Sequence, residues 1–161
     1  MSTHSIITIT DRNNNLKAAV YSFSDGYLDG VGLTILHDIK KMNFQTFEKN
    51  LNKVKFTDKK ELVDLAIEEY FGEYLEYYTQ KFSLGWCIVD AIEKTNLNSF
   101  YIEDETCYTD DCQYEYHIDF NKMTFYVVTK KFDVDHTMKI DRTKEYSLFN
   151  LPSDEDFVKL I

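Results

Sequence analysis

Residues 114–120 alternate strictly between large apolar and polar side chains, and this pattern restricts the backbone more than any other stretch of the chain. The apolar positions are Tyr114, Tyr116, Ile118 and Phe120, and the polar positions between them are Glu115, His117 and Asp119. A period of two residues is the period of a β-strand with one buried face. The segment therefore predicts a half-buried strand whose apolar side chains share one face and whose His117 points outward.

Further strands are expected at both ends of the chain. The predicted strands are residues 4–11, 16–23, 99–104 and 123–131. The first two are joined by an asparagine-rich turn, whose residues tolerate positive φ, and this arrangement predicts a hairpin. The dipeptide at 121–122 predicts a tight turn between the alternating strand and the strand that follows it.

Helical periodicity dominates the middle of the chain. Helices are predicted over residues 33–42, 57–82 and 85–94, with a short helix within 43–56 and a last turn within 153–160. Asp58 and Glu61 have the spacing of a capping box, and Gly72 is expected to bend or break the longest helix. Ser153, three residues before Asp156, is the expected cap of the last turn.

This order of elements predicts an α+β fold with a single antiparallel sheet, made of the N-terminal hairpin and the C-terminal strands, and with helices packed on one face. The length of 161 residues fits a single domain over 1–161.

The formal net charge is −10, from 28 acidic and 18 basic residues. Such a charge repels phosphate backbones, so nucleic acid is disfavoured as a partner, whereas a protein with a basic surface is favoured. The N-terminal residues do not have the pattern of a signal peptide, and no apolar run has the length of a membrane span. Together with an odd number of cysteines, these features predict a cytoplasmic protein with reduced thiols, without a disulfide.

Three of the five glycines fall within residues 26–32, between a predicted strand and a predicted helix. The candidate binding residues of this loop are Asp25, Gly26, Tyr27, Asp29, Gly30 and Gly32. One interpretation is backbone geometry, with at least one of these glycines at positive φ, one near the helix N-terminus, and a loop aspartate accepting amide hydrogen bonds. The other interpretations are an anion or small-ligand site at the helix start, a hard-cation site on the two aspartates, or a protein-binding loop anchored by Tyr27.

The loop also carries a resemblance. Asp25, Gly26, Tyr27, Gly30, Val31 and Gly32 stand where a family of small uncharacterised proteins of tailed phages and prophages has a loop of the type Asp-Gly-Tyr-x-x-Gly-Val-Gly. The chain resembles that family over residues 3–36 and more faintly over 114–128. It departs from the family pattern at Phe23 and Ser24, where the family has a histidine and an aromatic residue. It also has Leu28 for the family's proline and Asp29 for its glutamate. The resemblance implies a phage-like genome and no defined activity.

Catalytic signatures are not recognised in the chain. Cys107, Cys112 and His117 have an open spacing within an acidic stretch, and we expect solvated loop thiols rather than a zinc site. The remaining histidines are scattered, and the sequence contains no nucleophile elbow or metalloprotease motif. No catalytic residue, metal ligand or cofactor is therefore assigned, and the chain is not identified as an enzyme. The aromatic residues between Tyr70 and Phe82 are expected in the core or on a partner-facing strip.

The sequence thus favours a phage-type accessory protein that acts by binding, with inhibition of a host defence protein through its acidic surface as one candidate action. The alternative is a protein or enzyme that binds a nucleotide or another anion with residues 25–32. The sequence leaves the oligomeric state undetermined.

Overall fold

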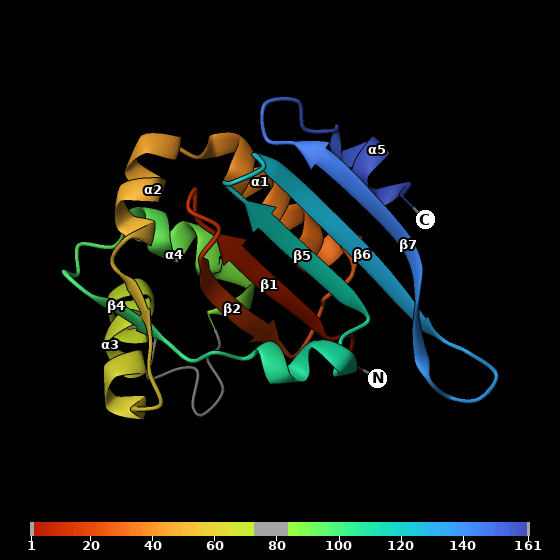
Figure 1. The fold of residues 1–161 in the computed structure, drawn as a ribbon, viewed down its shortest axis with the longest axis horizontal. Coiled ribbons are helices and arrows are strands. Elements are labelled where there is room, and N and C mark those ends of the chain that lie inside the picture. The colour runs from red at the N-terminus through yellow and green to blue at the C-terminus, as the bar shows by residue number, and fades with distance from the viewer. Residues whose placement is uncertain (1, 73–83, 161) are drawn as a thin grey trace.

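The computed structural model describes residues 2–72 and 84–160, and its centre is a twisted five-stranded sheet (Figure 1). The strand order is β2-β1-β5-β6-β7. The strands are β1 Ser5–Thr10, β2 Leu16–Ser22, β5 Tyr114–Asp119, β6 Thr124–Phe132 and β7 Met138–Ser147. The mixed α+β class predicted from the sequence is confirmed. The N-terminal hairpin is also present, with Asn14 of its turn at a φ of 63°.

The sheet is not purely antiparallel, so this part of the prediction was wrong. β1 pairs with β2 in the antiparallel sense on one side and with β5 in the parallel sense on the other. Between β2 and β5 the chain passes through all the helices of the middle region and then re-enters the sheet from the end at which β1 began. β2 runs opposite to β1 and ends at this same end of the sheet, so a strand that re-enters there and lies beside β1 runs parallel to it. β5 continues by a turn into β6, and β6 into β7, so the remaining pairs are antiparallel.

A second, two-stranded parallel sheet lies beside the first. It pairs β3 Val54–Phe56 with β4 Phe100–Ile102. The segment 43–56 was predicted as a short helix and contains both α2 Phe44–Leu51 and β3. The predicted strand at 99–104 is β4, which does not join the main sheet. β7 was not predicted at all.

Helices cover one face of the main sheet and form the core with it. They are η1 Leu28–Gly32, α1 Leu33–Lys41, η3 Gly85–Cys87, α4 Ile88–Lys94 and α5 Asp154–Val158, while α3 Lys60–Phe71 packs near β4. Ile35 of α1 and Ile92 of α4 share the core with Ile7, Ile118 and Phe125 of the sheet, and all five are buried. The opposite face of the main sheet is partly covered, because the 3₁₀ helix η4 Thr106–Asp111 contacts β1 and β2.

The helix ends confirm some of the predicted caps and correct others. α5 begins after Ser153, whose Oγ accepts a hydrogen bond from the Asp156 amide at 3.1 Å, as predicted. α3 begins after Lys59 rather than after Asp58, and no side chain caps it. It ends where expected, at Gly72, which has a φ of 54°. The rest of the predicted helix, with its aromatic residues at 74–82, lies outside the described residues.

The alternation in β5 is observed as predicted. Tyr116, Ile118 and Phe120 are buried, and Tyr114 is half-buried. His117 lies on the opposite face of the strand, but neighbouring side chains cover part of it. Within the described residues, no helix combines the length and the apolar character needed to cross a bilayer.

Candidate functional site

The glycine loop is closed by its own main chain. The amides of Gly30 and Gly32 donate to the Tyr27 carbonyl at 3.0 and 3.2 Å, and the Val31 amide donates to the Asp25 carbonyl at 2.8 Å. The Gly26 amide donates to the Thr3 carbonyl at 3.0 Å, which ties the loop to the start of β1. The donors that an anion at the start of α1 would require are therefore already used inside the loop.

The three glycines are required by close approach rather than by positive φ. A Cβ on Gly26 would lie 2.8 Å from the His4 carbonyl carbon, and a Cβ on Gly32 would lie 2.8 Å from the Tyr116 hydroxyl. A Cβ on Gly30 would overlap the Asp25 carbonyl oxygen. The predicted positive φ occurs at Asp25 instead, at 55°. An aspartate tolerates this conformation better than most residues, which explains how the turn forms without a glycine at that position.

Gly32 is the N-cap residue of α1, as predicted, but the groups that exclude a side chain there differ from those expected. They are Tyr116 of β5 and Phe157 of α5, not the second strand. The Tyr116 hydroxyl also donates a hydrogen bond to the Gly26 carbonyl at 2.7 Å. Burial raises the pKa of this phenol well above its usual value, so Tyr116 remains a hydrogen-bond donor.

The two loop aspartates do not close the loop with their side chains. The acceptor that Asp25 offers to the Val31 amide is its main-chain carbonyl, while its carboxylate accepts a hydrogen bond from the Tyr27 hydroxyl at 2.8 Å. This hydrogen bond raises the pKa of Tyr27. Asp29 is exposed. The loop therefore presents to solvent two carboxylates and the Tyr27 ring, while Leu28 and Val31 are buried beneath it.

An aromatic cluster missed by the sequence analysis lies next to this loop. Tyr21 of β2 is at its centre, with ring centroids 5.3 Å from His4, 4.5 Å from Phe23 and 5.1 Å from Tyr108. Tyr21 is buried, its hydroxyl lies 2.5 Å from Nδ1 of His4, and burial raises its pKa to about 12. Phe23 and Tyr108 are 51% and 44% exposed, and Tyr27 in the loop is 39% exposed.

The segment that carries Tyr108 is acidic. Residues 103–111, which include η4, contain Glu103, Asp104, Glu105, Asp110 and Asp111 and no basic residue. Glu105 fastens this segment to β2, because its amide donates to the Ala19 carbonyl and its carboxylate accepts from the Tyr21 amide. Burial raises the pKa of Glu105. We call the exposed rings of Phe23, Tyr27 and Tyr108, with the carboxylates of the loop and of 103–111, the acidic aromatic surface.

Of Cys107 and Cys112, which were both expected to be solvated loop thiols, only Cys107 is exposed. Cys107 is exposed, but Cys112 is buried, packs with Ile6 and Tyr21, and donates from Sγ to the Tyr108 carbonyl at 3.3 Å. Its pKa is raised by burial to about 12, so it is a neutral core thiol that anchors η4. Within the described ranges, no group of three or more histidine, cysteine or carboxylate side chains has the arrangement of a metal site.

His117 belongs to a polar cluster on the face of the sheet opposite the helices. Its Nδ1 lies 2.5 Å from Oγ1 of Thr8, and its Nε2 lies 3.8 Å from the carboxylate of Glu115, which pairs with Lys130 at 3.4 Å. Burial lowers the pKa of His117, and the Glu115 carboxylate partly offsets that effect. The Nζ of Lys130 also donates to the Thr109 carbonyl, so the cluster holds η4 against the sheet.

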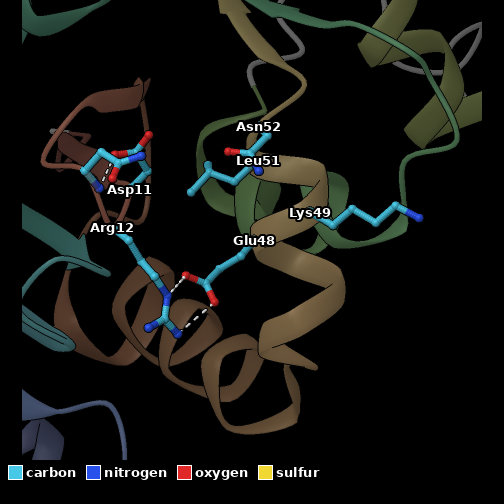
Figure 2. A pocket seen from close by; sticks show the side chains of 7 residues that line it. Asp11, Arg12, Glu48, Lys49, Leu51 and Asn52 are labelled. Carbon is cyan, nitrogen blue, oxygen red and sulfur yellow. Dashed lines mark hydrogen bonds and ion pairs between the residues drawn. The ribbon is translucent and has the colours of Figure 1, made fainter.

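A shallow hollow of about 350 Å³ lies between the first hairpin turn and α2 (Figure 2). Its lining residues are Asp11, Arg12, Asn13, Glu48, Lys49, Leu51 and Asn52. Arg12 reaches from the turn to Glu48 on α2 and bonds both carboxylate oxygens, at 2.5 and 3.1 Å. The Asp11 carboxylate accepts the amides of Asn13 and Asn15, both at 2.9 Å. The Arg12–Glu48 ion pair therefore fastens the hairpin turn to α2.

Comparisons of the chain with models of known protein families, with curated proteins and with solved structures find no match.

Proposed function

We propose that this chain acts by binding, and that its acidic aromatic surface docks on the basic surface of a partner protein. The observation that carries the proposal is the combination of three half-exposed rings, Phe23, Tyr27 and Tyr108, with the segment 103–111, which has five acidic residues and no basic one. Tyrosine and phenylalanine rings supply large apolar contact area at little cost in conformational entropy, and the carboxylates guide a basic partner to them.

The residues that lie behind the exposed rings hold them in place, and this supports the proposal. Tyr21 is buried behind Phe23 and Tyr108, and η4 is held by Glu105, Cys112 and Lys130. A preorganised surface loses little freedom on binding, which favours affinity. The closure of loop 25–32 by its own carbonyls argues in the same direction, because the amides that would bind a nucleotide or another anion are engaged.

The resemblance of residues 3–36 to the phage and prophage family suggests the biological setting. In that setting the partner would be a host protein in the cytosol of the infected cell, and a nucleic-acid-binding defence protein has the basic surface required. Binding to such a surface would block the access of its nucleic acid.

The test is capture of bacterial host proteins by the immobilised chain, followed by repetition with the purified captured protein. Tyr27→Ala and the double variant Phe23→Ser/Tyr108→Ser should each abolish capture while shifting Tm by only a few degrees. Val134→Ser, at an exposed apolar side chain far from this surface in sequence, is the matched control and should bind normally. Because the contact is between opposite charges, binding should weaken as salt is raised.

Two outcomes contradict the proposal. One is a captured protein whose binding is unaffected by the ring substitutions. The other is a rise in Tm of several degrees with a nucleotide or a divalent cation that Gly30→Ala removes, which would indicate a ligand site in the loop. A large loss of Tm in Tyr27→Ala would show that this ring is part of the core and would exclude it as an anchor.

A further inference from the structure

The hairpin of β6 and β7 extends beyond the rest of the sheet as a two-stranded ribbon (Figure 1). It begins at the register shift after Thr129, and its strands pair as far as Phe132 with Met138. We call residues 130–140 the ribbon. In the described structure β6 has β5 as its second neighbour only as far as Thr129, and β7 is the edge strand of the sheet.

One face of the ribbon is apolar. Lys130 pairs with Ile140 and Phe132 pairs with Met138, and directly opposed residues of an antiparallel pair point to the same side. This side continues the open face of the sheet, because Lys130 reaches Glu115 there. Phe132 and Ile140 are 59% and 63% exposed, and Val134 in the connecting turn is 95% exposed.

The lysines of the ribbon are paired with carboxylates, and Lys130 pairs with Glu115 of the sheet. On the face opposite Phe132, Lys131 bonds Asp141 at 2.5 Å, and Lys139 bonds Asp133, also at 2.5 Å. Counted over 130–141, so that Asp141 is included with its partner, three lysines and three aspartates cancel, and the remaining residues carry the whole net charge of −10. A second, equally acidic copy can therefore approach the ribbon with less repulsion than it would meet at the acidic aromatic surface.

We propose that the ribbon is a self-association site, in which the apolar faces of two ribbons pack together across a twofold axis. An isolated two-stranded ribbon is marginally stable in water and gains stability from a second layer on its apolar face. A twofold axis places Phe132, Ile140 and Val134 of one copy against the same residues of the other and leaves the paired charges on the outer sides. Because the ribbon projects, the acidic bodies stay apart.

The contact is small. Burying these side chains from two copies removes on the order of 1,000 Å² from solvent, which is near the lower limit of specific interfaces. We therefore expect a dimer that dissociates in the micromolar range. Higher salt should strengthen the dimer, because it screens the repulsion between the two acidic bodies and leaves the apolar contact intact.

The test is sedimentation equilibrium of the full chain across the micromolar range, with circular dichroism to verify folding. The wild type should pass from monomer to dimer, and the double variant Phe132→Glu/Ile140→Glu should weaken association at least a hundredfold. The milder Ile140→Ser should weaken it measurably and serves if the double variant does not fold. Phe23→Glu, which replaces an exposed ring of the acidic aromatic surface by a carboxylate, is the control and should leave the dimer intact.

Three results overturn this inference: a wild type that stays monomeric at the highest concentration, a dimer that survives both ribbon substitutions, or a dimer that Phe23→Glu dissociates instead. The last result would place self-association on the acidic aromatic surface. The inference is independent of the proposed function, because ring substitutions at Phe23 and Tyr108 test one surface and ribbon substitutions test the other.

Discussion

The glycine loop and the β6–β7 ribbon are both excursions from the same sheet, but they are stabilised in opposite ways. The loop is folded onto the body, with Leu28 and Val31 buried and with Gly30 and Gly32 bonded to the carbonyl of Tyr27. The ribbon projects from the rest of the protein and exposes its apolar side chains. It is stabilised by strand pairing and by exposed ion pairs. Buried main-chain hydrogen bonds and close packing contribute far more than exposed ion pairs.

This difference separates a segment whose residues are restricted by close packing from one whose side chains project into solvent. Where neighbouring segments approach within contact distance, as at Gly30 and Asp25, a single added carbon disrupts the structure. Where side chains project into solvent, as at Val134, substitution leaves the fold intact and changes only what the surface can bind.

The largest effect is expected at the tightest point of the loop. Gly30→Ala places a Cβ on the Asp25 carbonyl oxygen, so the loop must open or shift, and we expect a loss of about 3 kcal/mol in the free energy of unfolding. Gly72→Ala is the control, because a Cβ there lies within 4 Å of no atom of the described residues, and we expect a cost of about 1 kcal/mol from the positive φ. Urea denaturation measures both, and equal losses would show that the close approach at Gly30 is not restrictive.

A smaller loss is expected where β5 holds the loop. Tyr116→Phe removes the hydroxyl that donates to the Gly26 carbonyl and leaves that carbonyl without this donor, at a cost of about 1–2 kcal/mol. Tyr27→Phe removes a hydroxyl that donates to Asp25 at an exposed position, and its cost should stay below about 0.5 kcal/mol. Denaturation curves in which Tyr27→Phe is the more damaging change would contradict this ranking.

The two regions should also respond differently to acid. The hydrogen bond from Lys139 lowers the pKa of Asp133, and hydrogen bonds from Thr137 lower that of Asp135. A carboxylate whose pKa is depressed by folding stabilises the folded state above its unfolded pKa and loses that contribution as pH falls through the folded value. The ribbon should therefore lose amide protection as the pH falls below the ordinary aspartate range of about 4, while loop amides bonded to carbonyls keep theirs.

Hydrogen exchange followed by NMR, corrected for the intrinsic dependence on pH, measures this difference. The amides of Gly30, Val31 and Gly32 report on the loop, and those of Asp133 and His136 report on the ribbon. An equal decline at both places would indicate global acid unfolding and not the local titration of the two aspartates.

The smallest effect on stability is expected at the tip of the ribbon. Val134→Ser removes an apolar side chain that is already in solvent, so the free energy of unfolding should change by less than about 0.5 kcal/mol. Measured at a concentration where the chain is monomeric, a larger loss would mean that the ribbon packs against the body in solution.

Several elements followed from the sequence because their signals are local. The alternation at Tyr116 and Ile118 produced the buried face of β5, and Ser153 capped the last helix. β7 was not predicted, because it is an edge strand that is exposed on most of both faces. Its residues therefore do not alternate between apolar and polar side chains in the way that indicates a half-buried strand. The cap at Asp58 was wrong, since the helix starts later, and the Thr57 hydroxyl accepts the hydrogen bond from the Lys59 amide.

In the candidate site too, the features that depend on neighbouring residues could be predicted, and those that depend on residues distant in sequence could not. The glycines of the loop and the exposure of Tyr27 could be anticipated from residue types, but the aromatic cluster could not. Tyr21 and Tyr108 are far apart in the chain, and they meet only because the Glu105 segment is fastened to β2. The sequence contains both rings without any spacing that relates them.

The sequence by itself determined the strand and helix periods, the hairpin at the N-terminus, the acidic charge and the place of the glycine loop, because these depend on neighbouring residues along the chain. Only the tertiary structure decided that β5 lies parallel to β1 and why Gly30 must lack a side chain. It also decided which rings gather at Tyr21 and that residues 130–140 project with an apolar face. Each of these depends on groups distant in sequence, whose approach is set by the packing of the whole sheet against its helices.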